Sequence, residues 1–194
     1  MVRTQNYAVI LFIFSALLLA TACSEVSPAL SRYYDGRILT VSVREMKTVS
    51  ELRYTYTDAE RGQLHFLVTP SSADMELAML RISVGNHKAT SAVVNIDEQA
   101  AQLLDFANGR YFPVNVFAVQ QEVGPPENPA DEEKVPEFLL LWNGEQEDGT
   151  RQAFNLLQNT SLVGWMLFEV PKDARLRELR WRAGDSLTIQ FWPN

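Results

Sequence analysis

The stretch Ala78–Asn86, AMLRISVGN, shows the pattern that decides the fold of this chain. Leu80, Ile82 and Val84 are apolar, the residues between them are arginine and serine, and the run closes on Gly85-Asn86. Successive side chains of a β-strand point to opposite faces of the sheet. The alternation therefore predicts a strand with one face in a core, followed by a turn.

The same alternation recurs along the chain at short intervals, with no sustained helical stripe between the runs. The other runs that we expect to be strands are Leu39–Val43, Leu64–Val68, Ala92–Ile96, Tyr111–Val119, Phe138–Trp142, Val163–Val170, Leu179–Trp181 and Leu187–Phe191. Turns rich in Gly, Asn and Asp separate many of them. Many short strands without intervening helices predict an all-β protein, an antiparallel sandwich of two sheets. A closed barrel is the alternative.

The sequence of one segment fits either a helix or a strand. Asp97–Phe106, DEQAAQLLDF, has the Ala and Leu content of a short helix, but Leu103-Leu104 is equally able to begin a strand.

Four motifs follow one another in the body of the chain: LRISVGN at 80–86, LLDFANGRYFPV at 103–114, GWMLFEVPKDARLRELRW at 164–181 and SLTIQF at 186–191. In order and spacing they resemble a family of secreted bacterial immunoglobulin-like domains, mostly lipoproteins, that is related in fold to a mycobacterial immunogenic secreted antigen. The matching positions are Gly164, Phe168, Val170, Pro171, Leu179 and Trp181, together with Asp105 and Gly109, whereas Tyr111 comes one residue early.

The resemblance covers Gly36 to Phe191, with an insertion of low complexity at Gly124–Glu133. It implies an immunoglobulin-like β-sandwich, and it carries no catalytic residues to this chain. Within that fold, the alternation of Leu179 and Trp181 with Arg180 and Arg182 predicts that the tryptophan lies on the inner face of its strand.

The N-terminus has the layout of a secretory signal peptide. Arg3 supplies a positive charge, and Tyr7–Ala20 is an almost continuous apolar run that is shorter than a typical membrane-spanning helix. The following Ala20-Thr21-Ala22-Cys23 resembles the bacterial lipobox, in which the cysteine receives diacylglycerol and becomes the new N-terminus. Cys23 is the only cysteine of the chain, so it forms no disulfide within the domain, and we expect it to be lipidated.

These boundaries divide the chain into three parts. Residues 1–22 are the predicted signal peptide, 23–35 the lipidated N-terminus and a flexible tether, and 36–194 the β-sandwich domain. The expected location is the cell envelope, with the membrane bound through the acyl chains. In a Gram-negative source, the Ser24 that follows the cysteine resembles the sorting pattern for the outer membrane. The expected location is then the outer membrane, with the domain facing the periplasm.

The net charge and the available side chains argue against several classes of function. The formal net charge of −7 argues against nucleic acid as a partner, and no Gly-x-Ser-x-Gly elbow accompanies any serine. His65 is expected within a strand and His87 in a solvated turn, so we expect neither metal nor cofactor. The acidic segments Asp131–Glu133 and Glu145–Asp148 have at most the ligands of a weak calcium site.

Arg175, Arg177, Arg180 and Arg182 surround the apolar positions of the strand near residue 180. They are a candidate interaction surface for anionic lipid headgroups, glycans or an acidic partner. The other interpretation is that they are the wet side of an amphipathic strand, where charge discourages edge pairing.

Two hypotheses of function follow. The first is a lipid-anchored envelope lipoprotein with a non-enzymatic, immunoglobulin-like binding module and an envelope protein as partner. The alternative is an envelope hydrolase or carbohydrate-active enzyme that uses carboxylates of the acidic loops. Carboxylates that converge on a cleft would favour the enzyme, and an exposed patch would favour the binding module.

Overall fold

The described part of the chain comprises residues 30–128, 133–134, 140–143 and 153–192 of a computed structural model, and it is almost entirely β-structure. The prediction of an all-β protein is therefore confirmed. Within these ranges, every helix falls short of the length and apolar character that crossing a membrane requires. The predicted signal peptide, Cys23 and the tether as far as Ala29 lie outside the described residues.

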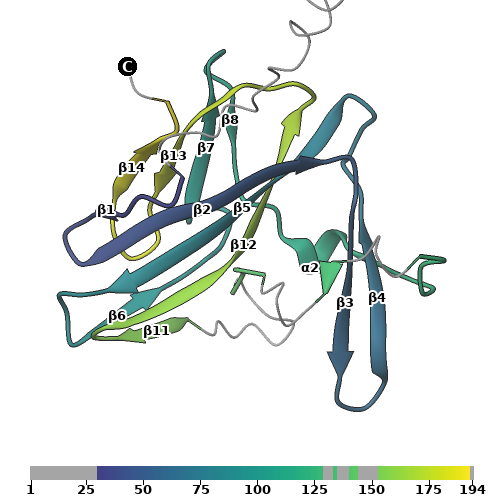
Figure 1. Cartoon of the computed structure of the whole chain (residues 1–194), viewed down its shortest axis with the longest axis horizontal. Helices are drawn as coiled ribbons and strands as arrows, with labels where there is room; N and C mark the ends of the chain where they lie inside the picture. Colours follow the sequence, from purple (N-terminus) through teal and green to yellow (C-terminus); the bar gives the residue numbers. More distant parts are fainter. Residues whose placement is uncertain (1–29, 129–132, 135–139, 144–152, 193–194) are drawn as a thin grey trace, which may run out of the picture.

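A central sheet runs through the middle of the molecule in the order β1-β2-β5-β12 (Figure 1). Its strands are β1 (Tyr34–Asp35), β2 (Leu39–Val49), β5 (Met75–Asn86) and β12 (Thr160–Pro171). Every pairing in it is antiparallel, and β5 is paired with β2 on one side and with β12 on the other. The strand β12 ends at Pro171, because proline has no N–H to donate to the ladder.

Three smaller groups of strands surround this sheet. The C-terminal sheet has the order β14-β13-β7-β8, and the hairpin sheet has the order β10-β3-β4-β9. The C-terminal sheet consists of β7 (Ala101–Asp105), β8 (Arg110–Tyr111), β13 (Leu176–Trp181) and β14 (Leu187–Gln190). The hairpin sheet consists of β3 (Leu52–Asp58), β4 (Gly62–Val68), β9 (Gln121–Val123) and β10 (Glu133–Lys134). The remaining elements are the two-stranded ribbon β6 (Ser91–Val94) and β11 (Phe154–Leu157), and the short helix α2 (Val116–Val119).

Alternate residues of β5 belong to two different hydrophobic cores. Ala78, Leu80, Ile82 and Val84 lie in a large core shared with the C-terminal sheet, whereas Leu77 and Met79 lie in a small core. The small core also contains residues of β3, β4, β12 and α2: Leu52, Tyr54, Val68, Trp165, Leu167 and Val116. Because both faces of β5 are covered over residues 77–80, the strand is apolar at each of these four positions, whereas Ile82 and Val84 beyond them alternate with polar residues.

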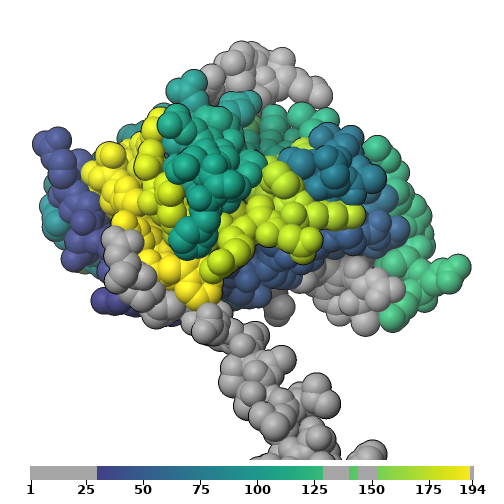
Figure 2. Space-filling model, turned by 90° about the horizontal axis from the view of Figure 1, so that it is seen from above, coloured from purple at the N-terminus to yellow at the C-terminus, as the bar shows by residue number. Residues whose placement is uncertain are grey.

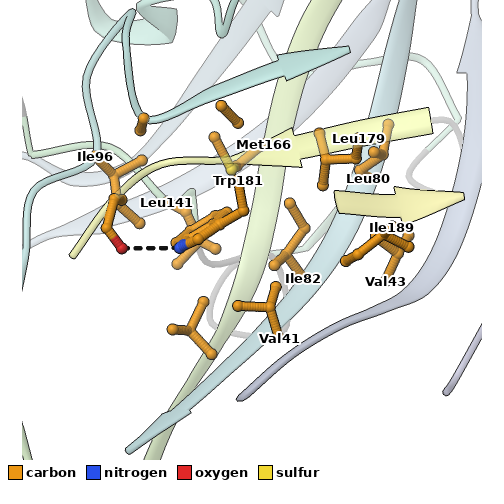
Figure 3. Close-up of a cluster of buried hydrophobic side chains, with 14 of the residues drawn as sticks. Val41, Val43, Leu80, Ile82, Ile96, Leu141, Met166, Leu179, Trp181 and Ile189 are labelled. Carbon is orange, nitrogen blue, oxygen red and sulfur yellow. Dashed lines mark hydrogen bonds between the residues drawn. The ribbon is translucent and has the colours of Figure 1, made fainter. Parts of the chain in front are cut away.

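Trp181 lies in the large core, as the alternation predicts. Its side chain and that of Leu179 are fully buried. Figure 3 shows the indole among side chains of the central sheet, including Ile82 and Met166. The indole N–H donates to the carbonyl oxygen of Ala183 at 2.8 Å, so the one polar atom of this side chain has a partner.

The helix considered for Asp97–Phe106 is wrong, and the strand alternative is correct. The backbone turns at Asp97, whose carbonyl accepts from the N–H of Ala100 at 3.1 Å, and Ala101–Asp105 then forms β7. All five residues of β7 are buried. Burial between β8 and β13 outweighs the helical propensity of the segment.

The single strand expected at Tyr111–Val119 is also wrong. Pro113 and Val114 pair briefly with β12, through a bridge to Phe168 and a 2.8 Å hydrogen bond from the N–H of Val114 to the carbonyl of Leu167. The side chain of Asn115 then accepts from the N–H of Ala118 and caps α2. Asparagine favours helix starts, so the strand ends there.

Two further differences concern strands. Alternation of apolar and polar residues does not mark β3, in which Leu52, Tyr54 and Thr55 are buried and Tyr56 and Thr57 are exposed. The strand expected at Phe138–Trp142 lies partly outside the described residues, and Leu140 forms a parallel bridge with Trp165.

The chain joins the domain earlier than the expected boundary at Gly36. The N–H of Ser31 donates to the carbonyl of Val43 at 2.7 Å, and Tyr34 and Asp35 form β1 against β2. Backbone hydrogen bonds therefore hold residues that the sequence analysis assigns to the tether.

Candidate functional site

A bulge in β13 gathers the predicted arginines on one face of the C-terminal sheet. Leu176 and Leu179 are both buried although they are three residues apart, a spacing that a regular strand places on opposite faces. The pairing of β13 with β7 shifts register between Leu176 and Glu178, so that Arg177 is the extra residue of a bulge. The bulge keeps both leucines in the core and leaves Arg177 beside Glu178.

The outward face of this sheet is defined by its register. Residues directly paired across strands share a face, and one such row is Gln190, Glu178, Leu104 and Arg110. The next row is Thr188, Arg180 and Gln102. Arg182 directly follows β13, and the alternation of the strand, continued by one residue, places it on the same side as Arg180. The strands thus bring together arginines that are far apart in sequence.

We call this surface the arginine face; it consists of Arg110, Arg175, Arg177, Arg180 and Arg182. In Figure 2 the C-terminal strands, in yellow, and the segment of β7 and β8, in teal, lie side by side on the surface. The sequence analysis names four of these residues and misses Arg110. Nothing near Arg110 in the sequence marks it, because only the pairing of β8 with β7 places it here.

One carboxylate lies within the arginine face. Glu178 is buried and accepts from the guanidinium of Arg180 at 2.7 Å, while the Nε of Arg177 is 3.6 Å from its other oxygen. Among the described residues, Arg110, Arg175 and Arg182 have no such carboxylate partner within 4 Å. The face therefore carries an excess of positive charge on a chain of net charge −7.

Two half-exposed aromatic side chains flank Arg110 in the chain, and the alternation of β8, continued past Tyr111, places Phe112 on the same side as Arg110. Phe106 is 47% exposed and Phe112 is 49% exposed. The guanidinium of Arg175 lies 5.1 Å from the centre of the Phe106 ring, a cation–π contact that leaves both groups at the surface. The arginine face thus combines cations with exposed apolar rings.

The β7–β8 turn is held by a buried carboxylate. Asp105 accepts from the N–H of Gly109 and from the hydroxyl of Tyr111, each at 2.7 Å. A Cβ on Gly109 would lie 2.8 Å from the Asp105 Oδ2, so the close approach requires glycine. The side chain of Asn108, in the same turn, accepts from Arg177 at 3.1 Å. These contacts fix the end of the arginine face, and they give the Asp-Gly-Tyr motif a structural role.

The same contacts change two pKa values. The hydrogen bond from Tyr111 lowers the pKa of Asp105, with smaller contributions from backbone N–H groups and Arg177. Burial, together with the hydrogen bond to Asp105, raises the pKa of the Tyr111 hydroxyl to about 12. At neutral pH the pair is therefore a phenol that donates to a carboxylate.

The predicted histidines are far from this face. His65 lies on β4, with its Nδ1 3.5 Å from the Oγ1 of Thr55, and the exposed imidazole of His87 lies over Gly85. In the described ranges, no three His, Cys, Asp or Glu side chains are grouped in a way that would hold a metal ion.

The acidic segments are only partly described. Asp131, Glu132 and the segment 144–152 lie outside the described residues, and of Glu133 only its backbone in β10 is described. Asn143 is described, and its amide donates to the carbonyl of Val94 at 3.2 Å while its oxygen accepts from the N–H of Ile96. These two hydrogen bonds hold Asn143 against residues 94–96.

A hollow lies between β3 and the segment after β9, on a different part of the molecule. It is lined by Glu51, Arg53, Pro126 and Glu127. Both carboxylates are exposed, and that of Glu51 accepts from Arg53 at 2.9 Å. A general acid at neutral pH needs a desolvated carboxyl, and this hollow does not provide one.

No protein-family model matches the chain. No curated protein matches it either. Three solved bacterial structures are similar to this chain, with low sequence identity and low TM-scores. YcdA of Bacillus subtilis, described as a "putative lipoprotein", has 14% identity and a TM-score of 0.44 over 81% of this chain and 37% of its own. The chain thus spans little more than a third of that protein.

YjhA of Bacillus subtilis has 11% identity and a TM-score of 0.46, over 80% of this chain and 83% of its own. A functionally unknown protein from Listeria monocytogenes has 12% identity and a TM-score of 0.41, over 87% of this chain and 85% of its own. Likenesses of this size establish neither a shared topology nor a shared function.

Proposed function

We propose that the protein is a lipid-anchored lipoprotein of the bacterial cell envelope, with an immunoglobulin-like β-sandwich as a non-enzymatic binding module. Cys23 carries the acyl chains after the signal peptide 1–22 is removed, and in a Gram-negative source the domain faces the periplasm from the outer membrane. The proposal for the anchor rests on the single cysteine in Ala-Thr-Ala-Cys, at the one position where lipidation requires it.

The arginine face is the binding surface in this proposal. The observation that carries it is the bulge at Arg177, which adds a third arginine to those at 180 and 182 while the leucines stay buried. Charge that served only to keep an edge strand from pairing would be expected on β14, the edge strand beside β13, whereas β13 is an inner strand. The cations lie across a sheet face, where a ligand of opposite charge has access to them.

The enzymatic alternative has less support. The carboxylates of the hollow beside β3 are exposed, and one of them is paired with Arg53. Acid–base hydrolysis of glycosides needs a carboxylic acid in a desolvated environment beside a carboxylate, and neither carboxylate of this hollow is desolvated.

Two measurements test the proposal. Labelled palmitate should enter the wild-type protein in cells and should not enter Cys23→Ala, which should also be lost from the membrane fraction. Equal incorporation in both proteins would rule out the anchor.

For the binding surface, we compare the lipidated wild type with the double variant Arg110→Gln/Arg182→Gln in affinity capture from native membranes. Both arginines are exposed and have no ion pair with any described residue, so the fold should tolerate the change. Arg53→Gln/Arg61→Gln, on the β3–β4 hairpin, changes the net charge equally and serves as the control. Loss of the captured material in the first variant alone is expected, and equal capture by all three proteins would contradict the assignment.

A further inference from the structure

We infer that the ligand of the arginine face is the layer of anionic phospholipid headgroups of the membrane that carries the anchor. This inference rests on the proposed lipid anchor at Cys23 and names the partner of the proposed binding surface. The domain then lies against the bilayer with the arginine face toward the headgroups, in one orientation.

The chain between the anchor and the domain is short. Six residues, Ser24 to Ala29, separate Cys23 from Leu30, the first described residue. Fully extended, that segment spans at most about 25 Å. The domain therefore remains within one domain diameter of the headgroups, at a high effective concentration.

The point where the chain enters the domain is the second argument. β1 lies beside β14, the edge strand of the C-terminal sheet, as Figure 1 shows. The carboxylate of Asp185, in the turn between β13 and β14, accepts from the N–H of Ile38 at 2.7 Å and of Leu39 at 3.0 Å. The entering chain is thus fastened to the sheet that carries the arginine face.

The chemistry of the face is the third argument. Arg110, Arg175 and Arg182 have no carboxylate partner among the described residues, so their guanidinium groups are available to phosphates, which they bind through two parallel hydrogen bonds. The cations are spread over rows of a sheet face, an arrangement that suits a planar layer of phosphates.

The exposed aromatic rings favour a lipid surface over an acidic protein. Phe106 and Phe112 are each about half exposed, and Arg175 lies against Phe106. Surfaces that bind at a membrane interface bury Phe, Trp and Leu side chains at the boundary of headgroups and acyl chains and carry Lys and Arg beside them. A soluble acidic partner would bind the cations but would leave the two rings without an apolar environment.

The experiment uses the mature lipidated protein with a reporter on the face. Phe112→Cys is labelled with an environment-sensitive nitrobenzoxadiazole dye, and Tyr56→Cys on β3, exposed to 48%, is the reporter control. Each protein is reconstituted into vesicles of phosphatidylcholine with or without phosphatidylglycerol. We expect a blue shift of the dye at position 112 only on the anionic vesicles, reversed by high salt, and no shift at position 56.

The arginine contribution is measured in the same reporter background. A cation near an anionic surface strengthens binding about fivefold, so Arg110→Gln/Arg182→Gln should lower the ratio of docked to undocked protein about thirtyfold. Arg53→Gln/Arg61→Gln should leave that ratio unchanged. Equal emission on both kinds of vesicle, or an equal effect of both double variants, would overturn the inference. A shift that appears only when native membrane proteins are added would assign the face to a protein partner instead.

Vesicle flotation distinguishes a protein without the lipid anchor from a lipidated protein that does not dock. An unlipidated protein would have a second free thiol at Cys23 and would not float with phosphatidylcholine vesicles. That result would contradict the proposed function. A lipidated protein whose dye emission is the same with and without anionic lipid would contradict only the docking.

Discussion

Replacing Trp181 with alanine removes the largest fully buried side chain among the described residues of the large core. The indole fills the space between β13 and the central sheet, so its loss leaves a cavity there. Substitutions of this kind cost about 3–5 kcal/mol. The loss should lie toward the upper end of that range, because the carbonyl of Ala183, 2.8 Å from the indole nitrogen, loses its partner. This is a large part of the stability of a typical domain.

The assay is urea unfolding followed by circular dichroism. Trp181→Ala should lower the midpoint with little change in the slope m, which reports the surface exposed on unfolding. Arg182→Ala is the matched control, because Arg182 is the next residue, is exposed and lies on the other face; it should change the free energy of unfolding by less than about 0.5 kcal/mol.

If the alanine variant does not fold, Trp181→Phe keeps most of the buried volume and loses the N–H. A loss of about 1–2 kcal/mol is then expected. A Trp181→Ala variant as stable as Arg182→Ala would refute the described packing. It would also invalidate the register that places the arginines on the outward face.

Three other changes test parts of the structure. Because Tyr111 lowers the pKa of Asp105, the stability that this carboxylate contributes is complete above about pH 4 and is lost as the pH falls through the lower value of the folded protein. Asp105→Asn should therefore flatten the acid limb of the stability profile, and an unchanged profile would contradict the assignment. Asp185→Ala leaves the backbone N–H groups of Ile38, Leu39 and Ser186 without their acceptor and should lower the free energy of unfolding by about 1–2 kcal/mol in denaturant unfolding. An unchanged free energy would mean that water replaces the carboxylate fully. Deletion of Pro125–Glu132 should shift the melting temperature little, because this polar, Pro-bearing segment has little apolar surface to bury; a large fall would mean that the segment packs on the domain.

Much of the fold is predictable from the sequence because burial on one side of a strand produces a period of two. This holds for the inner positions of β13 and β14. It fails where the environment is not one-sided. All five residues of β7 are buried, so the segment has no alternation and looks equally suited to a helix. In β3, the three buried residues Leu52, Tyr54 and Thr55 do not alternate with exposed ones, so they do not mark a strand.

The candidate site was predictable only in part. The four arginines of 175–182 are visible as a cluster in the sequence, but their common face depends on the bulge at Arg177, which strict alternation does not predict. Arg110 joins them through the register of β8 with β7, a long-range pairing that no local pattern encodes. Phe106 and Phe112 would ordinarily be assigned to the core; Phe106 is exposed in the turn between β7 and β8, and Phe112 directly after β8.

The two cores share the same two strands, and this has a consequence for how the domain opens. β5 and β12 each give alternate side chains to the large core and to the small core, so loss of either core exposes one face of the same strand pair. Each core is closed on one side by this shared strand pair, so neither keeps both of its walls when the pair separates. We therefore expect unfolding in a single cooperative step. The amide hydrogens of β5 should exchange with solvent only when the whole domain unfolds, while those of the β3–β4 hairpin tip exchange through local opening.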